Sequence, residues 1–238
     1  MAHTPWQQRD SPKVALDRVY ISIAGLIGAG KSSLATALGE ELDLPVYYEP
    51  VTDNEYLEDF YADMSRYGFA LQVHLLNKRF RQQQEIVWSE AGAVQDRTIY
   101  EDAVFARMLA DDGLMDRRDY ETYLSLFTTM AHFMQKPDVI VYLDVTPEES
   151  LQRIRMRKRE VESGMTLEYL TKLHAAYQDF LADVSRSVHV IRVDYSQFRT
   201  AEEMAAEIAR QHAANLHISH VRWAAPAGQT AAIEEQPQ

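Results

Sequence analysis

Five short apolar runs recur along the chain, and longer stretches with helical signals separate them. The runs span Val19–Ala24, Pro45–Tyr48, Gly92–Gln95, Val139–Leu143 and Val188–Val193. Because their apolar character is nearly continuous rather than alternating, they are typical of strands buried on both faces. Parallel strands of this kind need crossover helices between them. The pattern therefore predicts an α/β fold with a five-stranded parallel sheet flanked by helices.

Two helix starts strengthen this interpretation. Thr146-Pro147-Glu148-Glu149 follows the fourth run and combines an N-cap residue, a proline at the first helical position and a capping-box glutamate. Thr200-Ala201-Glu202-Glu203 repeats the capping box after the fifth run. Both segments predict a helix that begins soon after a strand.

Length and composition indicate one folded domain. The chain has 238 residues, of which 46% are hydrophobic and 25% charged, an ordinary balance for a globular protein. We expect a flexible extension over residues 1–17, a single domain over 18–220 and a disordered tail over 221–238. The tail is rich in alanine, proline, glycine, glutamine and glutamate without any period.

Charge and residue usage exclude several classes of function. The net charge of −12 argues against a nucleic-acid partner, which needs clustered lysine and arginine. The absence of cysteine excludes disulfides, zinc ribbons and thiol nucleophiles. No run of about eighteen apolar residues and no signal-peptide stretch is present, so we expect no membrane partner and a cytoplasmic location.

A phosphate loop, Gly25–Ser32, follows the first predicted strand. Its sequence GLIGAGKS matches the pattern of glycine, four residues and Gly-Lys-Ser, and it opens a helix. Glycines let backbone N–H groups surround phosphates, while Lys31 supplies charge and Ser32 reaches Mg²⁺. The pattern predicts a P-loop NTPase fold that binds ATP and Mg²⁺, rather than a glycine-rich turn that binds nothing. The loop residues assigned to ATP are Gly25, Gly28, Ala29, Gly30, Lys31, Ser32 and Ser33.

Charged side chains follow the next two predicted strands. Glu49 comes after the second strand, and Asp96 and Arg97 come after the third. Open α/β sheets bind ligands at the carboxyl ends of their strands, so we expect these residues near the phosphate loop. One carboxylate can accept the proton of an attacking hydroxyl, the other can help hold Mg²⁺, and the arginine can offset charge. Taken by itself, Glu49 would be interpreted as a solvated loop residue.

The order and spacing of these motifs resemble the deoxynucleoside kinase family, which includes deoxycytidine, deoxyguanosine and deoxyadenosine kinases. Besides the phosphate loop, the matching segments are EPV at 49–51, YADMSRYGFALQ at 61–72, DRTIYED at 96–102, and the basic segment 153–162 with LEYL at 167–170. The resemblance implies ATP-dependent phosphorylation of the 5′-hydroxyl of deoxynucleosides and a helical lid segment. It also implies a homodimer formed through helices that include 71–81 and 120–134.

The resemblance further implies roles for individual residues. Glu49 would be the general base and Arg97 would orient the 5′-hydroxyl, so that these two and Lys31 form the catalytic set. Tyr61 and Glu162 would hydrogen-bond the sugar 3′-hydroxyl. Together these groups would surround the acceptor hydroxyl and the transferred phosphate.

Other residues complete the implied site. Gln72 would read the edge of the base, and Arg157 and Arg159 in the lid would close over the ATP phosphates. Ser32 and Asp96 would hold Mg²⁺. Asp96 stands where many animal members of the family have glutamate, so its shorter side chain favours contact with the metal through water.

The choice of base depends on a possible charged pair. Arg79 lies seven residues after Gln72, on the same face of the predicted helix, and could pair with Asp102. The resemblance implies that this pair crowds the place that a thymine methyl group would occupy. Ala106 stands where deoxycytidine kinases carry an aromatic residue, although Phe105 is adjacent. These features favour purine deoxynucleosides, with deoxycytidine second and thymidine unfavourable. A surface ion pair on an exposed helix is the alternative interpretation of Arg79 and Asp102.

Two other functions stay open at this point. A nucleoside-monophosphate kinase, such as a thymidylate kinase, would share the loop, the sheet and the lid, but it needs extra arginines for the acceptor phosphate. Here the acceptor side offers Glu49, Tyr61 and Glu162 instead, and such an anionic pocket would repel that phosphate. A nucleotide-binding subunit without catalysis is the second alternative, and the intact phosphate loop, Glu49 and Arg97 argue against it.

Overall fold

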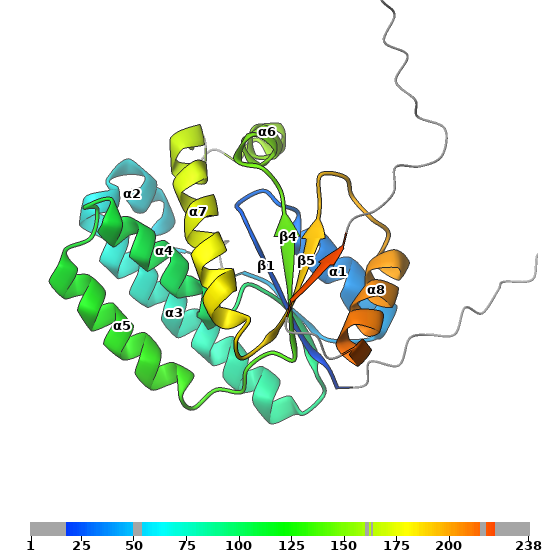
Figure 1. Cartoon of the computed structure of the whole chain (residues 1–238). Helices are drawn as coiled ribbons and strands as arrows, with labels where there is room; N and C mark the ends of the chain where they lie inside the picture. Colours follow the sequence, from blue (N-terminus) through cyan, green and yellow to red (C-terminus); the bar gives the residue numbers. More distant parts are fainter. Residues whose placement is uncertain (1–17, 50–53, 160–161, 163, 215–217, 222–238) are drawn as a thin grey trace, which may run out of the picture.

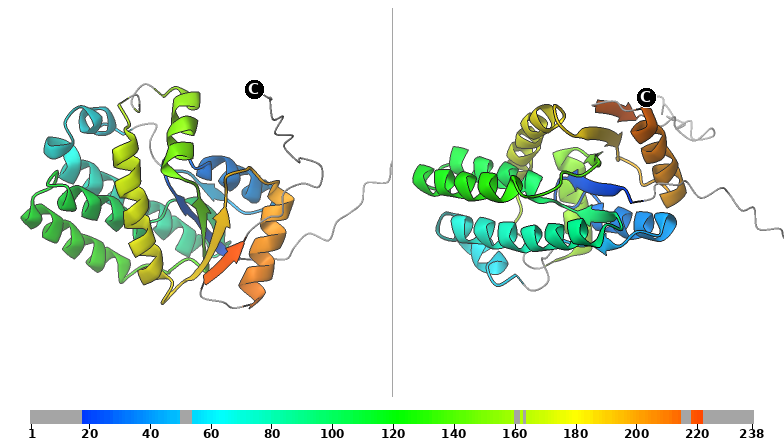
Figure 2. Two further views of the ribbon diagram at one scale, coloured as in Figure 1. Left: turned by 45° about the horizontal axis from the view of Figure 1, so that its top comes forward. Right: turned by 90° about the horizontal axis from the view of Figure 1, so that it is seen from below.

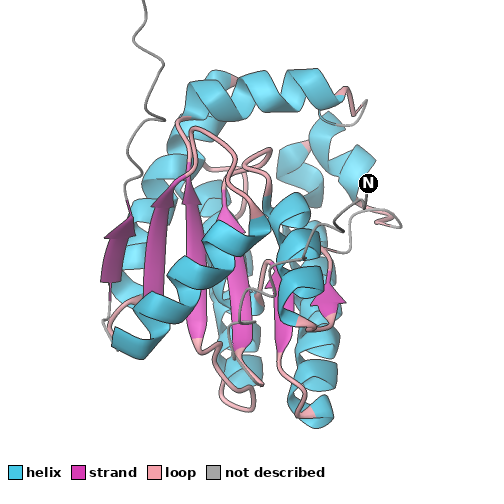
Figure 3. Cartoon of the chain, turned by 90° about the vertical axis from the view of Figure 1, so that its right-hand side faces the viewer, coloured by secondary structure: helices cyan, strands magenta, loops and turns pink. Residues whose placement is uncertain are grey.

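The computed structural model describes residues 18–49, 54–159, 162, 164–214 and 218–221. These residues form one sheet of six parallel strands in the order β2-β3-β1-β4-β5-β6 (Figure 1, Figure 3). The strands are β1 Tyr20–Gly25, β2 Val46–Tyr47, β3 Ala93–Asp96, β4 Val139–Asp144, β5 His189–Asp194 and β6 Ile218–Val221.

Helices cover both faces of this sheet. α1 and α8 pack together on one face, and α3, α4, α5 and α7 lie together on the other (Figure 1, Figure 2). The helices are α1 Lys31–Leu42, α2 Leu57–Ala62, α3 Met64–Ser89, α4 Ile99–Asp111, α5 Arg117–Ala131, α6 Pro147–Arg157, α7 Leu167–Val184 and α8 Ala201–Ala214. Within the described part of the chain, none of them combines the length and apolar character needed to cross a membrane.

The predicted α/β fold and its five strands are confirmed, and a sixth strand extends the sheet. The sequence pattern does not predict β6, which pairs in parallel with β5. Its four residues, Ile-Ser-His-Val, are too few and too polar to form an apolar run. The expected domain ends at 220, whereas Val221 is still part of β6. The rest of the expected tail, 222–238, and the expected extension, 1–17, lie outside the described residues.

Both expected capping boxes are present. At the start of α6, the Thr146 hydroxyl accepts from Glu149 N at 3.2 Å, and the Glu149 carboxylate accepts from Thr146 N at 2.8 Å. Thr200 and Glu203 make the same exchange before α8, at 3.2 and 3.1 Å. Each box satisfies backbone N–H groups that have no partner within the helix, so the sequence fixes where these two helices begin.

The parallel register brings the candidate functional residues to one edge of the sheet. β1, whose six residues are all buried, pairs with β3 on one side and β4 on the other. Its carboxyl end leads into the phosphate loop, Glu49 follows β2, and Asp96 ends β3. These strand ends point the same way, and α6 lies above them in Figure 1.

The junction between α1 and β2 leaves no room for a side chain at Gly39. A Cβ at this position would lie 2.1 Å from Val46 Cγ2 and 3.1 Å from the Leu44 carbonyl oxygen. We expect Gly39→Ala to lower the free energy of unfolding by about 1–3 kcal/mol, because α1 would be pushed off β2. Urea denaturation measures this change.

A second substitution separates this clash from a general effect of alanine. Gly39→Ala combined with Val46→Ala should recover part of the lost stability, because the shorter side chain removes the closest contact. Gly164→Ala is the matched control, since a Cβ there would meet no atom within 4 Å. Equal stability of Gly39→Ala and the wild-type protein would contradict the packing described here.

Candidate active site

The phosphate loop is shaped by glycine and held by α6. Gly28 and Gly30 have φ angles of +79° and +102°, in the left-handed region that favours glycine. A Cβ on Gly28 would lie 2.9 Å from Ile154 Cγ1, because α6 packs directly on the loop. From the same helix, Arg153 donates to the Ala29 carbonyl at 3.0 Å. The loop backbone is therefore fixed from the side of α6, at the N-terminus of α1 where phosphates bind well.

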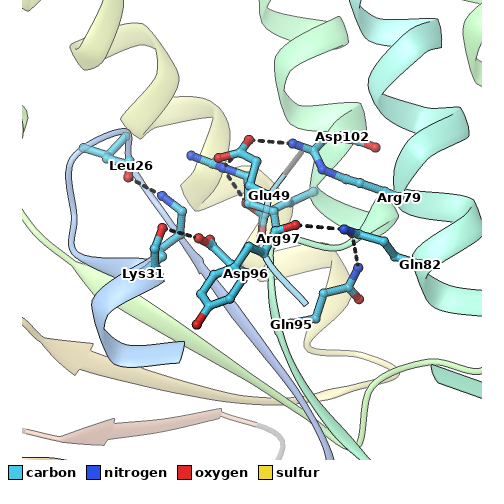
Figure 4. A network of polar contacts seen from close by, with 12 residues as sticks. Leu26, Lys31, Glu49, Arg79, Gln82, Gln95, Asp96, Arg97 and Asp102 are labelled. Carbon is cyan, nitrogen blue, oxygen red and sulfur yellow. Dashed lines mark hydrogen bonds and ion pairs between the residues drawn. The ribbon is translucent and has the colours of Figure 1, made fainter. Parts of the chain in front are cut away.

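Lys31 is buried at the start of α1. Its Nζ donates to the Leu26 carbonyl at 2.8 Å, as Figure 4 shows. Burial and the nearby Arg97 lower the pKa of Lys31 to about 8, although Asp96 and Glu49 act in the opposite direction. The ammonium group is thus held inside the loop, where a bound phosphate would stabilise its charged form.

A hydrogen bond between the side chains of Ser32 and Asp96 joins the phosphate loop to the end of β3. Within the described residues it is the only side-chain hydrogen bond that does so. Ser32 Oγ donates to Asp96 Oδ2 at 2.5 Å. The other carboxylate oxygen, Oδ1, is buried and has no hydrogen-bond partner within the described residues. Burial raises the pKa of Asp96, against the opposing charge of Lys31. An unpartnered carboxylate oxygen beside a hydroxyl is a donor set that fits a hard cation such as Mg²⁺.

Glu49 lies between two arginines (Figure 4). Its Oε1 is 2.7 Å from Arg79 Nη2 and 3.1 Å from Arg97 Nε. Burial by itself would raise the pKa of Glu49, but Arg97, Arg79 and Lys31 outweigh it and lower the pKa to about 2. Glu49 is therefore ionised at neutral pH and, being 23% exposed, more accessible than either arginine.

Arg97 contacts two groups to which the sequence analysis gives no role. Its Nη1 donates to Glu101 Oε1 at 2.5 Å and also to the Tyr177 hydroxyl, and Tyr177 donates to Glu101 at 2.8 Å. Glu101 belongs to the motif at 96–102, and its spacing of four residues from Arg97 was an available signal. Tyr177 carried no signal, because only the fold brings α7 to the end of β3.

Arg79 and Asp102 form a buried ion pair between α3 and α4. Arg79 is 1% exposed and Asp102 is fully buried, so the alternative of a surface pair is wrong. The same guanidinium contacts Glu49, which the sequence analysis does not anticipate. Arg79 therefore joins the expected base pocket to the expected proton acceptor.

Two of the three remaining candidates for the base pocket line one cavity. Gln72 is buried, lines the cavity described below, and its Oε1 has no hydrogen-bond partner within the described residues. Phe105 lines the same cavity, and its ring lies 5.0 Å from the Arg97 guanidinium. Ala106 is fully buried and does not line it. Phe105 is thus the aromatic residue that the fold presents on this side.

The lid residues pair with one another. Arg157 donates to both carboxylate oxygens of Glu162, at 2.8 and 2.5 Å, and Arg159 Nη1 lies 3.8 Å from the same carboxylate. Glu162 is 7% exposed. The arginines expected to bind phosphate and the glutamate expected to bind the sugar are therefore in contact. A ligand that binds either of these groups would compete with the ion pair between them.

A cavity of about 660 Å³ connects these groups. Its wall includes Tyr61, whose pKa burial raises, and Arg153, which lies 4.8 Å from the ring of Phe198. The predicted site residues that line it are Gly28, Gly30, Lys31, Ser32, Ser33, Glu49, Tyr61, Gln72, Arg79, Arg97, Arg157, Arg159 and Glu162. Four other predicted site residues are buried and do not line the cavity, namely Gly25, Ala29, Asp96 and Asp102. One cavity thus reaches from the phosphate loop to the expected base pocket.

Comparisons with known proteins identify a family that matches most of the chain. The deoxynucleoside kinase family (dNK) matches residues 21–217. The deoxyadenosine kinase of Dictyostelium discoideum is 54% identical over 200 residues, which cover 84% of this chain and 82% of that protein. The deoxyadenosine/deoxycytidine kinase of Bacillus subtilis (strain 168) is 37% identical over 201 residues, covering 83% and 93%.

Solved structures give the same picture. The structure of deoxyadenosine kinase from M. mycoides with the products dCMP and a flexible dCDP bound has a TM-score of 0.74 and 26% sequence identity. The comparison covers 82% of this chain and 100% of that chain. The similarity in fold therefore extends over most of this chain and all of that chain.

Proposed function

Because the chain belongs to the deoxynucleoside kinase family, we propose that it transfers the γ-phosphate of ATP to the 5′-hydroxyl of deoxyadenosine as its preferred substrate. Deoxyguanosine and then deoxycytidine follow in the proposed order. The observation that carries the proposal is the ionised Glu49 between two arginines, in a cavity shared with the phosphate loop. The phosphorylation of deoxynucleosides is the activity of the family, whereas the base preference is our inference.

The acceptor side of the cavity favours a hydroxyl over a phosphate. Arg79 and Arg97 are the arginines nearest to Glu49 within the described residues, and both are already paired with carboxylates. Glu162 adds a further carboxylate. An acceptor phosphate would have to enter beside Glu49 and Glu162, while the two arginines nearest to Glu49 are already paired with carboxylates, which is unfavourable. This supports a nucleoside rather than a nucleoside monophosphate as acceptor.

In the proposed reaction, the 5′-oxygen attacks the γ-phosphorus while the bond to the β–γ bridging oxygen breaks. Glu49 accepts the proton of the hydroxyl, and Arg97 holds the carboxylate and the reacting oxygens in line. Because the transition state is loose, the proton moves late, and a carboxylate of low pKa is a sufficient acceptor. Lys31, together with Arg157 and Arg159 of the lid, offsets the charge of the phosphates.

Mg²⁺ belongs to the same proposal. Asp96 and Ser32 would hold it, directly or through water, because their oxygens are adjacent and one carboxylate oxygen lacks a partner within the described residues. When bound with ATP, the cation would neutralise phosphate charge.

The base preference rests on the pocket made by α3 and α4. Gln72 offers one free acceptor oxygen among the described contacts, and Arg79 is fixed by Asp102 beside it. An amide can pair with the amino and ring-nitrogen edge of adenine in a bidentate manner. Ala106 is buried and does not line the cavity, so the base preference rests on Gln72 and Arg79 and not on Ala106. The names of the two relatives described above, a deoxyadenosine kinase and a deoxyadenosine/deoxycytidine kinase, support deoxyadenosine as the preferred substrate.

A matched substrate panel tests the proposal. We expect Mg·ATP-dependent phosphorylation with kcat/KM highest for deoxyadenosine, lower for deoxyguanosine and deoxycytidine, and lowest for thymidine, with no turnover of deoxyadenosine monophosphate. Turnover of the monophosphate alone would replace the proposal with a monophosphate kinase. If kcat/KM ranked the nucleosides in another order, the proposed base preference would be wrong, but the proposed nucleoside kinase activity would still hold.

Assembly and location complete the proposal. We propose a homodimer through α3 and α5, which is supported by apolar side chains exposed on them, Trp88 at 75%, Leu126 at 42% and Phe133 next to the end of α5 at 76%. A mass in solution that corresponds to a monomer would contradict the proposed homodimer.

We also propose a cytoplasmic location, which is supported by the use of ATP and by the sequence features given above. We also propose that residues 18–221 form the catalytic domain.

A further inference from the structure

We propose that Tyr177 and Glu101 are positioning residues that hold Arg97 in the orientation needed for phosphoryl transfer. This inference rests on the role proposed for Arg97 and names two residues that orient its side chain. The two groups come from different helices, Tyr177 from α7 and Glu101 from α4. Neither lines the cavity, so they act through Arg97 rather than on substrate.

The contacts form a closed ring at one end of the guanidinium. Arg97 Nη1 donates to Glu101 Oε1 and to the Tyr177 hydroxyl, and that hydroxyl donates onward to the same Oε1 at 2.8 Å. Nε, at the other end of the guanidinium, faces Glu49 at 3.1 Å. Because a planar guanidinium has fixed donor directions, fixing Nη1 also fixes the direction of Nε.

Burial makes this ring stiff. Arg97 is 2% exposed, Glu101 is 1% exposed and Tyr177 is fully buried. The ring of Phe105 covers the guanidinium at 5.0 Å and packs edge-on against Tyr177 at 6.3 Å. Water therefore cannot replace a lost contact easily, and a side chain held this way cannot turn without disturbing several neighbours.

Glu101 gives Arg97 a second carboxylate partner besides Glu49. Burial raises the pKa of Glu101, and the nearby charges of Arg97 and Lys31 offset this rise only in part. Glu49 is the carboxylate that takes up a proton in the proposed reaction, so Arg97 would then lose one anionic partner. Glu101 Oε1 keeps its hydrogen bonds with Arg97 and Tyr177, so the arginine stays in place while the charge on Glu49 changes.

The ring also connects Arg97 to the helix that follows the lid. Tyr169 lines the cavity near the start of α7, and Tyr177 lies eight residues later, about two turns along the same face. One rigid helix therefore spans the distance from the cavity wall to the back of the catalytic arginine.

Tyr177→Phe tests the inference with the loss of one hydroxyl. We expect kcat to fall about tenfold, with the KM values for ATP and deoxyadenosine within about threefold of wild type, because a misplaced group costs transition-state rather than ground-state binding. Glu101→Gln should lower kcat further, by about thirtyfold to a hundredfold. Tyr142→Phe is the matched control: Tyr142 is fully buried against Tyr177 but makes no hydrogen bond to Arg97 among the described contacts, and its kcat should stay within twofold.

A second background separates positioning from a general structural effect. In Arg97→Lys, which lacks Nη1, adding Tyr177→Phe should change the single-turnover rate by less than twofold, with enzyme in excess over nucleoside. The inference would be overturned if Tyr177→Phe lowered the rate by the same factor in the wild-type and Arg97→Lys backgrounds. It would also be overturned if Tyr142→Phe lowered kcat as much as Tyr177→Phe does. Full turnover of Arg97→Lys would instead count against the role proposed for Arg97 itself.

Discussion

Glu49→Gln should lower kcat about a thousandfold while leaving the affinity for ATP within threefold of wild type. The amide has nearly the same shape as the carboxylate and can still accept hydrogen bonds from Arg79 and Arg97, but it cannot take up the proton of the 5′-hydroxyl. Steady-state rates with deoxyadenosine and calorimetric titration with ATP measure the two quantities.

The matched control for this substitution is Glu40→Gln. Glu40 is exposed on α1, which also carries Lys31 and Ser32, but its side chain does not line the cavity. Its replacement should leave kcat unchanged. If Glu49→Gln retained more than a tenth of the wild-type kcat, another group would have to accept the proton, whereas a loss of ATP affinity as well would indicate damage to the phosphate loop.

Arg79→Met should destabilise the folded protein by about 3–5 kcal/mol. The substitution leaves Asp102 buried and charged, and Arg79 is the only ion-pair partner of Asp102 within the described residues. Asp102→Asn should cost less, because Arg79 keeps its contact with Glu49 at 2.7 Å. Urea denaturation followed by fluorescence measures both changes.

The double variant gives the sharpest result for this pair. Arg79→Met with Asp102→Asn should be more stable than Arg79→Met alone, because no unpaired charge stays buried. Arg117→Met, which removes an arginine exposed at 90% from a surface pair with Glu121, should leave stability unchanged. A double variant as unstable as the sum of both single variants would mean that the two residues do not act as a pair.

The fold was predictable from the sequence because its signals are local. Continuous apolar runs such as Val139–Leu143 mark strands buried on both faces, and the capping box at Thr146 marks the start of a helix. The position of the phosphate loop between a strand and a helix is a local pattern as well. Since parallel strands end at the same edge, the meeting of Glu49, Asp96 and Arg97 also followed from the order of strands.

The remaining features depend on contacts between distant segments. β6 has only four residues, and its pairing with β5 rather than an apolar run of its own defines it. The contact of Arg79 with Glu49 joins residues thirty positions apart, and that of Arg97 with Tyr177 joins residues eighty positions apart. Side-chain type and spacing carry no information on such pairs, which the packing of α3 and α7 against the sheet determines.

The buried charges around the cavity have a consequence for how long the protein persists in a cell. The groups that lie almost entirely out of water are Lys31, Arg79, Asp96, Arg97, Glu101 and Asp102. Removing charges from water lowers the stability of the native state, whereas bound nucleoside and ATP raise it in proportion to the logarithm of their concentration. Proteases act on the unfolded fraction. We therefore expect the protein to be degraded faster when nucleoside and ATP are scarce than when they are abundant.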